Sequence, residues 1–70
     1  MRRILTRTVK TSGLYSLVVE EDNNRYYAEV YLEDKLHNRE GPYFDQDEAE
    51  ARSDILRYDA FKAGWGKRND

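Results

Sequence analysis

The side chains that could carry out chemistry in this 70-residue chain are few and scattered. His37 is the only histidine, and it stands beside Asn38 with no candidate nucleophile nearby in the sequence. A catalytic histidine needs an orienting partner and a nucleophile within reach. Ser12, Ser16 and Ser53 stand in no nucleophile-elbow pattern, and cysteine is absent. The sequence therefore predicts no catalytic residue, and we expect a protein that is not an enzyme.

Carboxylates are numerous, but their spacing does not form a metal site. The stretch "DQDE" at residues 45–48 lacks the glycine at the sixth position and the glutamate at the twelfth position of a calcium loop. The same residues suit the start of a helix, with Asp45 as the N-cap and Glu48 as the reciprocal member of a capping box. The four glycines form no phosphate-binding loop. We therefore expect neither a metal nor a cofactor.

The net charge of −2 conceals an uneven distribution along the chain. Residues 1–10 carry a net charge of +4, residues 20–50 carry −8, and residues 51–70 carry +2. An acidic middle between basic ends favours either internal ion pairing or a partner with a basic surface, and the sequence leaves both open. The basic start is followed by no long apolar run, so we expect no signal peptide, no membrane association and a cytoplasmic location.

A hairpin and one helix would position these side chains. Alternating apolar residues predict an antiparallel hairpin over residues 14–33, and capping signals predict a helix over residues 45–63 that ends at Gly64. Residues 1–10 are either an edge strand or a basic arm, residues 37–43 either a loop or a third strand of the sheet, and residues 64–70 a short tail. The sequence thus predicts a single α+β domain, with an antiparallel three- or four-stranded sheet and one C-terminal helix packed on one face.

The predicted strand over residues 25–33 has one face that suits a core and one that suits a contact surface. The core face consists of Tyr26, Ala28, Val30 and Leu32, and the other face of Tyr27, Glu29, Tyr31 and Glu33. Tyrosines among charged residues are common at protein contacts, although they also occur on open faces of antiparallel sheets. We expect Leu14 and Val18 to extend this tyrosine patch across the hairpin, and Glu20 to lie at its rim.

The predicted helix carries two apolar stripes. The stripe that suits close packing on a sheet contains Ala49, Ser53, Leu56, Ala60 and Ala63. The second stripe lies nearly opposite and contains Ala51, Ile55 and Tyr58, with Phe61 on its flank. A helix in a two-layer domain needs one such stripe, so we expect the second to be covered by the N-terminal segment, by the tail, or by another molecule. The predicted partner-binding residues are therefore Tyr27, Glu29, Tyr31, Glu33, Glu20, Ile55 and Tyr58.

The run "SGLYSLVVEEDNNRYYAEVYLED", followed by "YFDQDEAEARSDIL", resembles the strand–turn–strand and capped-helix plan of small proteins from phages and other mobile elements, some anti-CRISPR inhibitors among them. The helix start at Asp45, Glu48 and Ala49 is also similar to the N-terminal part of HicB-type antitoxins. The chain lacks the proline–glycine loop and the C-terminal DNA-binding extension of that family. The likeness covers residues 12–63. It implies a compact, non-catalytic, acidic protein that binds a basic surface on a larger nucleic-acid-handling complex.

We therefore expect a non-enzymatic protein-binding module, an inhibitor or adaptor that presents an acidic, tyrosine-bearing surface. A homodimer through either surplus surface is also open. The alternative is a small nucleic-acid-binding accessory protein that uses its basic ends and an aromatic side chain, namely Arg2, Arg3, Arg7, Trp65, Lys67 and Arg68. The overall acidity, and the glutamates that flank Tyr27 and Tyr31, make phosphate binding the less favoured prediction.

Overall fold

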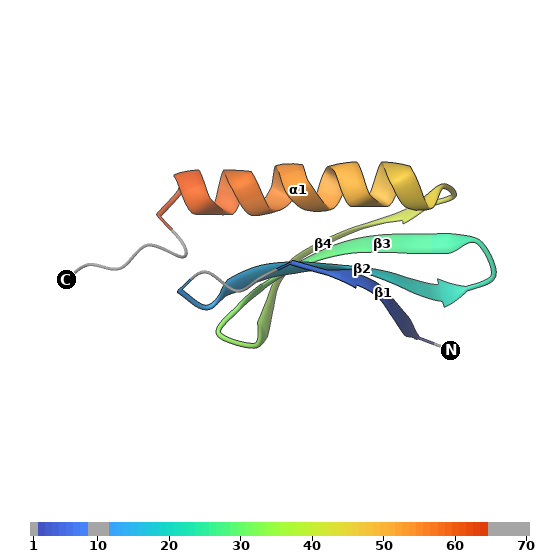
Figure 1. The fold of residues 1–70 in the computed structure, drawn as a ribbon, viewed down its shortest axis with the longest axis horizontal. Helices are drawn as coiled ribbons and strands as arrows, with labels where there is room; N and C mark the ends of the chain where they lie inside the picture. Colours follow the sequence, from blue (N-terminus) through green and yellow to red (C-terminus); the bar gives the residue numbers. More distant parts are fainter. Residues whose placement is uncertain (1, 9–11, 65–70) are drawn as a thin grey trace.

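The computed structural model describes residues 2–8 and 12–64 of the chain. Its elements are β1 (Arg3–Arg7), β2 (Leu14–Asp22), β3 (Arg25–Leu32), β4 (Lys35–Tyr43) and α1 (Gln46–Lys62). The strands form one antiparallel sheet in the order β1-β2-β3-β4, and α1 lies across one face of it (Figure 1). The predicted α+β architecture with one C-terminal helix is confirmed, and the sheet has four strands. The N-terminal segment joins it as an edge strand, and the strand expected over residues 37–43 begins two residues earlier.

Tight turns join β2 to β3 and β3 to β4. The turn between β3 and β4 consists of Glu33 and Asp34, both in the left-handed region with φ of 52° and 67°. Two consecutive residues at positive φ are typical of the turn that suits the twist of a hairpin. The backbone N–H of Glu33 donates to the carbonyl oxygen of Gly13 at 2.9 Å, which ties this turn to the start of β2. The turn before β3 contains Asn24 at a φ of 62°, as the asparagines of the sequence suggest.

The core between α1 and the sheet is made of small and aliphatic side chains. Leu14, Ala28 and Val30 from the sheet pack against Leu56 and Ala60 of α1. The predicted inner stripe of the helix is confirmed for Ala49, Ser53, Leu56 and Ala60, which are buried, whereas Ala63 is the exposed C-cap. The alanines of this stripe allow the helix backbone to lie close to the strands. One polar group is included in this layer, because the hydroxyl of Ser53 donates to that of Ser16 at 2.8 Å, and both serines are buried.

The ends of α1 follow the predicted signals, apart from details of the first turn. Asp45 is the N-cap, and its carboxylate accepts a hydrogen bond from the N–H of Asp47 at 3.2 Å. Phe44, the residue before this N-cap, is 72% exposed. The C-cap is Ala63, and Gly64 follows with a φ of 106°. Within the described residues, no helix combines the length and the apolar character that a membrane span requires.

Candidate functional site

The seven predicted contact residues lie on separate parts of the molecule. Tyr27, Glu29 and Tyr31 belong to the sheet face opposite α1, which we call the open sheet face. Ile55 and Tyr58 are exposed on the outer face of α1. The two remaining glutamates lie elsewhere: Glu33 in the turn after β3, and Glu20 in β2, where it accepts a hydrogen bond from Arg3. The two predicted surfaces therefore lie on opposite sides of the molecule and cannot meet one partner surface together.

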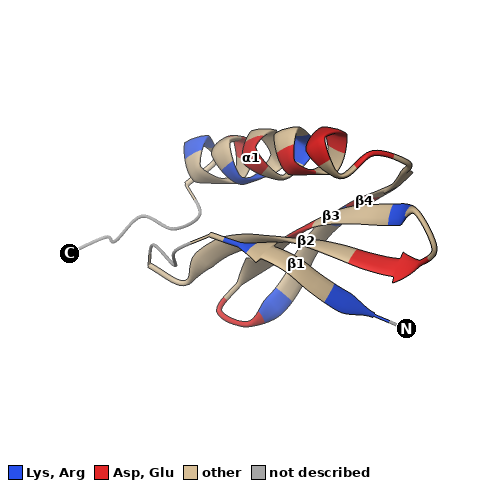
Figure 2. Cartoon of the chain, turned by 45° about the vertical axis from the view of Figure 1, so that its right-hand side comes forward, with Lys and Arg blue, Asp and Glu red and all other residues tan. Residues whose placement is uncertain are grey.

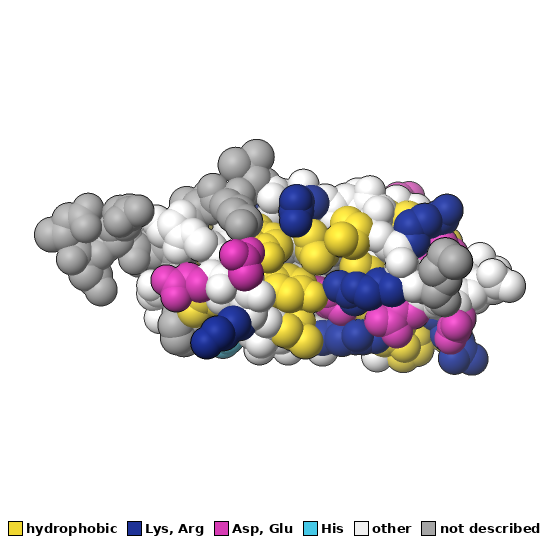
Figure 3. Space-filling view, turned by 90° about the horizontal axis from the view of Figure 1, so that it is seen from below, with side chains coloured by type: hydrophobic (Ala, Val, Ile, Leu, Met, Phe, Trp, Pro, Cys, Tyr) yellow, Lys and Arg dark blue, Asp and Glu magenta, His cyan; other side chains and the backbone are white. Residues whose placement is uncertain are grey.

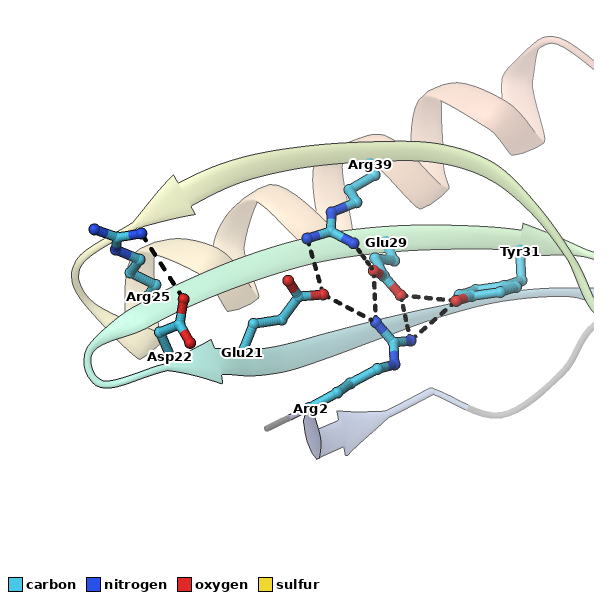
Figure 4. Close-up of polar contacts among 7 residues, drawn as sticks. All are labelled: Arg2, Glu21, Asp22, Arg25, Glu29, Tyr31 and Arg39. Atoms are coloured by element: carbon cyan, nitrogen blue, oxygen red, sulfur yellow. Dashed lines mark hydrogen bonds and ion pairs between the residues drawn. The ribbon is translucent and has the colours of Figure 1, made fainter.

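Glu29 is the centre of a polar network on the open sheet face (Figure 4). Arg2 reaches it with two hydrogen bonds, from Nη1 to Oε2 at 2.9 Å and from Nη2 to Oε1 at 2.7 Å. Arg39 of β4 approaches from the other side, with its Nη1 3.2 Å from Oε2 of Glu29 and its Nη2 2.9 Å from Oε2 of Glu21. The hydroxyl of Tyr31 donates to Glu29 at 2.8 Å and accepts from Arg2 at 3.0 Å. This network links β1 and β4, the two edges of the sheet, through one carboxylate on β3.

The network sets the charge state of its members. Burial alone would raise the pKa of Glu29, but hydrogen bonds from Arg2 and Tyr31 hold this pKa below its ordinary value. The hydrogen bond with Glu29 raises the pKa of Arg2. Burial, together with the neighbouring carboxylate, raises the pKa of Tyr31. Glu29 is only 1% exposed, so it is an internal structural anion, and it does not present its charge to a partner as the sequence analysis expected.

The open sheet face is largely covered by its own side chains. Tyr15, Leu17 and Val19 of β2 are buried there although no helix lies over them, and Tyr27 and Tyr31 of β3 pack beside them. The rings of Tyr15 and Tyr31 stack, with centroids 5.3 Å apart and planes within 7°. Arg2 spans this layer, since it precedes β1 and bonds to Glu29 on β3, beyond β2. Figure 3 shows the resulting surface, with apolar side chains in the middle and charged ones beside them.

A guanidinium group lies over Tyr27, the second tyrosine that β3 contributes to the open sheet face. The Cζ atom of Arg39 is 4.0 Å from the ring centroid of Tyr27, a cation–π distance. On the neighbouring strand, Gly41 leaves room for this ring, because a Cβ at that position would lie 2.6 Å from Cδ2 of Tyr27. The ring of Tyr27 therefore contacts two residues of β4, the backbone at Gly41 and the guanidinium group of Arg39, and it is only partly accessible.

The expected extension of the tyrosine patch by Leu14 and Val18 is wrong. Cross-strand partners share a face of the sheet, and Tyr31 pairs with Tyr15 while Tyr27 pairs with Val19. Leu14 and Val18 therefore point to the α1 side, where Leu14 belongs to the helix-facing core. The cause is a shift of register between Glu20 and Asp22, which moves all side chains of β2 before it to the opposite face.

The outer face of α1 and the residue before its N-cap carry most of the large apolar side chains that are exposed within residues 2–8 and 12–64. Six large apolar side chains are exposed among the described residues, and four of them lie on α1 or directly before its N-cap: Phe44 (72% exposed), Tyr58 (61%), Ile55 (45%) and Phe61 (39%). The other two, Ile4 and Leu36, are single residues of the edge strands. Of these four residues, Ile55 and Tyr58 lie three positions apart on one side of α1, whereas Phe44 precedes the helix and lies about three turns from Ile55. Neighbouring exposed apolar residues such as Ile55 and Tyr58 mark interaction sites more often than scattered ones.

The exposed charges of α1 are mainly acidic. Asp47, Glu48, Asp54 and Asp59 are exposed, and acidic residues gather in the N-terminal half of the helix (Figure 2). The arginines of α1 reach towards the sheet, since Arg52 donates to Glu40 at 2.8 Å and Arg57 donates to Ser16 at 2.8 Å. The same Nη1 of Arg57 lies 3.1 Å from Oδ1 of Asp54, so this one acid of the helix is paired. Lys62 lies with its Nζ 5.5 Å from the ring centroid of Tyr58. The outer face of α1 therefore has apolar side chains with acidic side chains around them.

The basic residues proposed for nucleic-acid binding are partly engaged within the chain. Arg2 bonds to Glu29, Arg3 bonds to Glu20 at 2.6 Å, and the Cζ of Arg7 lies 5.7 Å from the ring centroid of Tyr15. Trp65, Lys67 and Arg68 lie outside the described residues. Within residues 2–8 and 12–64, no group of three or more His, Asp or Glu side chains is placed to hold a metal ion.

Comparison of the chain with models of protein families, with curated proteins and with solved structures finds no significant match.

Proposed function

We propose that this protein is a non-enzymatic protein-binding module that meets its partner through the outer face of α1. The observation that supports this function is the group of exposed apolar side chains on α1, among them Ile55 and Tyr58. These two residues are three positions apart and lie on one side of a helix, as do the anchor residues of helices that dock into apolar grooves. The partner would therefore offer a groove that receives Ile55 and Tyr58.

The charges of α1 indicate the kind of groove. Its exposed surround carries four carboxylates, and the exposed base Lys62 already lies near Tyr58. A partner with basic residues around an apolar groove would complement this surface and would be steered towards it. Complexes that handle nucleic acids present such basic surfaces, so the role implied by the resemblance, a phage or mobile-element inhibitor or adaptor, fits this proposal.

Affinity capture from the lysate of the native host tests the proposal, with the double variant Ile55→Ser/Tyr58→Ser compared with the wild type. The matched control is Ile4→Ser/Leu36→Ser, because these two residues are also about half exposed, at 51% each, but pair with Val19 and Tyr31 of the open sheet face. We expect the wild type and the control to capture the same protein, and the α1 variant to lose it.

Two further results would redirect the proposal. If the control loses the partner and the α1 variant keeps it, the contact is on the open sheet face and our choice of surface is wrong. A parallel capture after nuclease treatment tests the nucleic-acid alternative, since a partner bridged by nucleic acid disappears under nuclease. Light scattering during gel filtration reports whether a second copy of the chain occupies the α1 surface, because the wild type would then be a dimer and the α1 variant a monomer.

A further inference from the structure

The N-terminal strand β1 is attached to the sheet by pairing with a single strand and by side-chain contacts. It is five residues long, it forms one edge of the sheet, and its backbone pairs with β2 alone. Its firmest link to the rest of the molecule is made by a side chain, because Arg2 reaches across β2 to the carboxylate of Glu29. To separate from the sheet, β1 must break its pairing with β2 and the side-chain clamp that the bonds of Arg2 to Glu29 form. It must also break three smaller contacts: the ion pair of Arg3 with Glu20, the contact of Arg7 with the ring of Tyr15, and the hydrogen bonds of Thr8 with Ser16. The pairing of β2 with β3 and of β3 with β4 does not involve β1.

The edge of β2 that pairs with β1 would be unfavourable to expose to water. Residues 14–19 of β2 are all buried, which makes β2 the most enclosed strand of the sheet. If β1 left, the nine-residue β2 would become the edge, with open backbone hydrogen-bonding groups beside buried apolar side chains. Glu29, only 1% exposed, would at the same time lose its closest cationic partner. A strand that fills this place must bring a guanidinium group for Glu29 as well as a backbone that pairs with β2.

A second copy of the chain carries the strand that meets these requirements. Its β1 is preceded by Arg2, which reaches Glu29, and carries Arg3 opposite Glu20 and the apolar Ile4 opposite Val19. We propose that β1 is exchangeable between two copies of this chain, so that β1 of one molecule pairs with β2 of the other and its Arg2 closes on the Glu29 of that molecule. Exchange of an identical element replaces each intramolecular contact by the same contact between molecules, which is a low-cost route to a dimer.

Disulfide trapping between two single-cysteine variants tests the exchange. The chain contains no cysteine, so each introduced thiol reports on one position only. Arg3 and Glu20 are directly paired across β1 and β2, and their exposed ion pair contributes little to stability. When Arg3→Cys and Glu20→Cys are mixed and oxidised slowly, a disulfide between the two variants forms at this site only if β1 of one molecule docks on β2 of the other.

The control mixture combines Arg3→Cys with Glu48→Cys, whose thiol lies on the exposed surface of α1. We expect the first mixture to form several times more mixed dimer than the control, as measured on denaturing gels with variants of different tag length. Equal yields from the two mixtures would overturn the proposal, because they would reflect random collisions only. Circular dichroism of each variant verifies that the variants are folded.

The clamp itself provides the second measurement. Arg2→Met in both partners removes two hydrogen bonds to a charged group, and this should accelerate formation of the mixed dimer by about tenfold or more. An unchanged rate would contradict the proposal, because β1 would then leave the sheet without breaking the contact that holds it. This result does not depend on the α1 surface, so it is independent of the proposed function.

Discussion

Replacing Glu29 by glutamine removes one charge from the network of the open sheet face and changes little else. The amide keeps the shape of the side chain and one acceptor oxygen, but Arg2 and Arg39 then face a neutral group. Removing one partner of a buried ion pair costs about 3 to 5 kcal/mol. Because the side chains of Arg2 and Arg39 are 39% and 33% exposed and can be hydrated, we expect the lower end, about 3 kcal/mol.

Urea unfolding followed by far-ultraviolet circular dichroism measures this loss. In a domain of this size a loss of about 3 kcal/mol should lower the midpoint of thermal unfolding by about 12 to 24 °C. The matched control is Glu33→Gln, which removes the same charge from an exposed turn and should change the free energy of unfolding by less than about 0.5 kcal/mol. A loss below about 1 kcal/mol for Glu29→Gln would refute the reasoning, because it would mean that water screens this carboxylate despite its burial.

The difference in stability between the wild type and Glu29→Gln should depend on pH, and the lowered pKa of Glu29 gives the direction. The pKa of Glu29 is lower in the folded chain than in the unfolded chain, where it is about 4.3. Its stabilisation is therefore complete above the unfolded pKa and is lost as the pH falls through the folded pKa. The gap in stability between wild type and Glu29→Gln should be constant near neutral pH and shrink below about pH 4. Other carboxylates with lowered pKa, such as Glu21 and Glu40, are present in both proteins and cancel in the difference.

Two further substitutions test the packing and the hydrogen bonding of the same face. Gly41→Ala should lower the free energy of unfolding in urea by at least about 2 kcal/mol, because the φ of Gly41 is +144° and the new Cβ would lie 2.6 Å from the ring of Tyr27. The control is Gly64→Ala, whose new Cβ would have no atom within 4 Å. It should cost only the backbone strain of about 1 kcal/mol. Tyr31→Phe should lower the free energy of unfolding by about 1 to 2 kcal/mol, since it removes the hydroxyl that donates to the buried carboxylate of Glu29. Tyr58→Phe on the exposed helix face should change it by less than about 0.5 kcal/mol. Equal losses of stability in the two variants would contradict the role assigned to the network.

Local signals predicted the helix and the central hairpin well. Asp45 as N-cap and Gly64 after the last turn act within a few residues, so they can be recognised without knowing the rest of the fold. The edge strands were harder, since the pairing of β1 and the full length of β4 depend on neighbours far away in the sequence. A turn at Glu33 and Asp34 was also not predicted, because neither residue type announces two consecutive positive φ angles as asparagine or glycine would.

One extra residue explains the error about the two faces of β2. A two-residue turn directly between Asp22 and Arg25 would bring even-numbered residues of β2 opposite odd-numbered residues of β3. The bulge next to this turn shifts the register by one residue, so that odd positions pair with odd positions. Sequence patterns rarely reveal such a bulge, yet it decides whether Leu14 lies under the helix or on the open sheet face.

Internal pairing and a partner with a basic surface were left open as alternatives for the acidic middle of the chain, and in the fold the first leaves exposed acids on α1. Arg2 and Arg39 are directed to Glu29 on the open sheet face, and Arg52 is directed to Glu40 on the side of α1. Cations used in this way are not available to balance the acids on the outer side of the helix, and Asp47, Glu48 and Asp59 form no ion pair with a described residue.

The modest net charge of −2 therefore hides a difference between the two faces of the molecule. The open sheet face carries its charges as closed pairs, and its aromatic rings are stacked or covered by guanidinium groups. The outer face of α1 combines exposed apolar side chains with carboxylates, of which Asp47, Glu48 and Asp59 form no ion pair with a described residue. Binding through this face should therefore weaken as salt increases, in proportion to the carboxylates a partner meets, while binding through the open sheet face would change little.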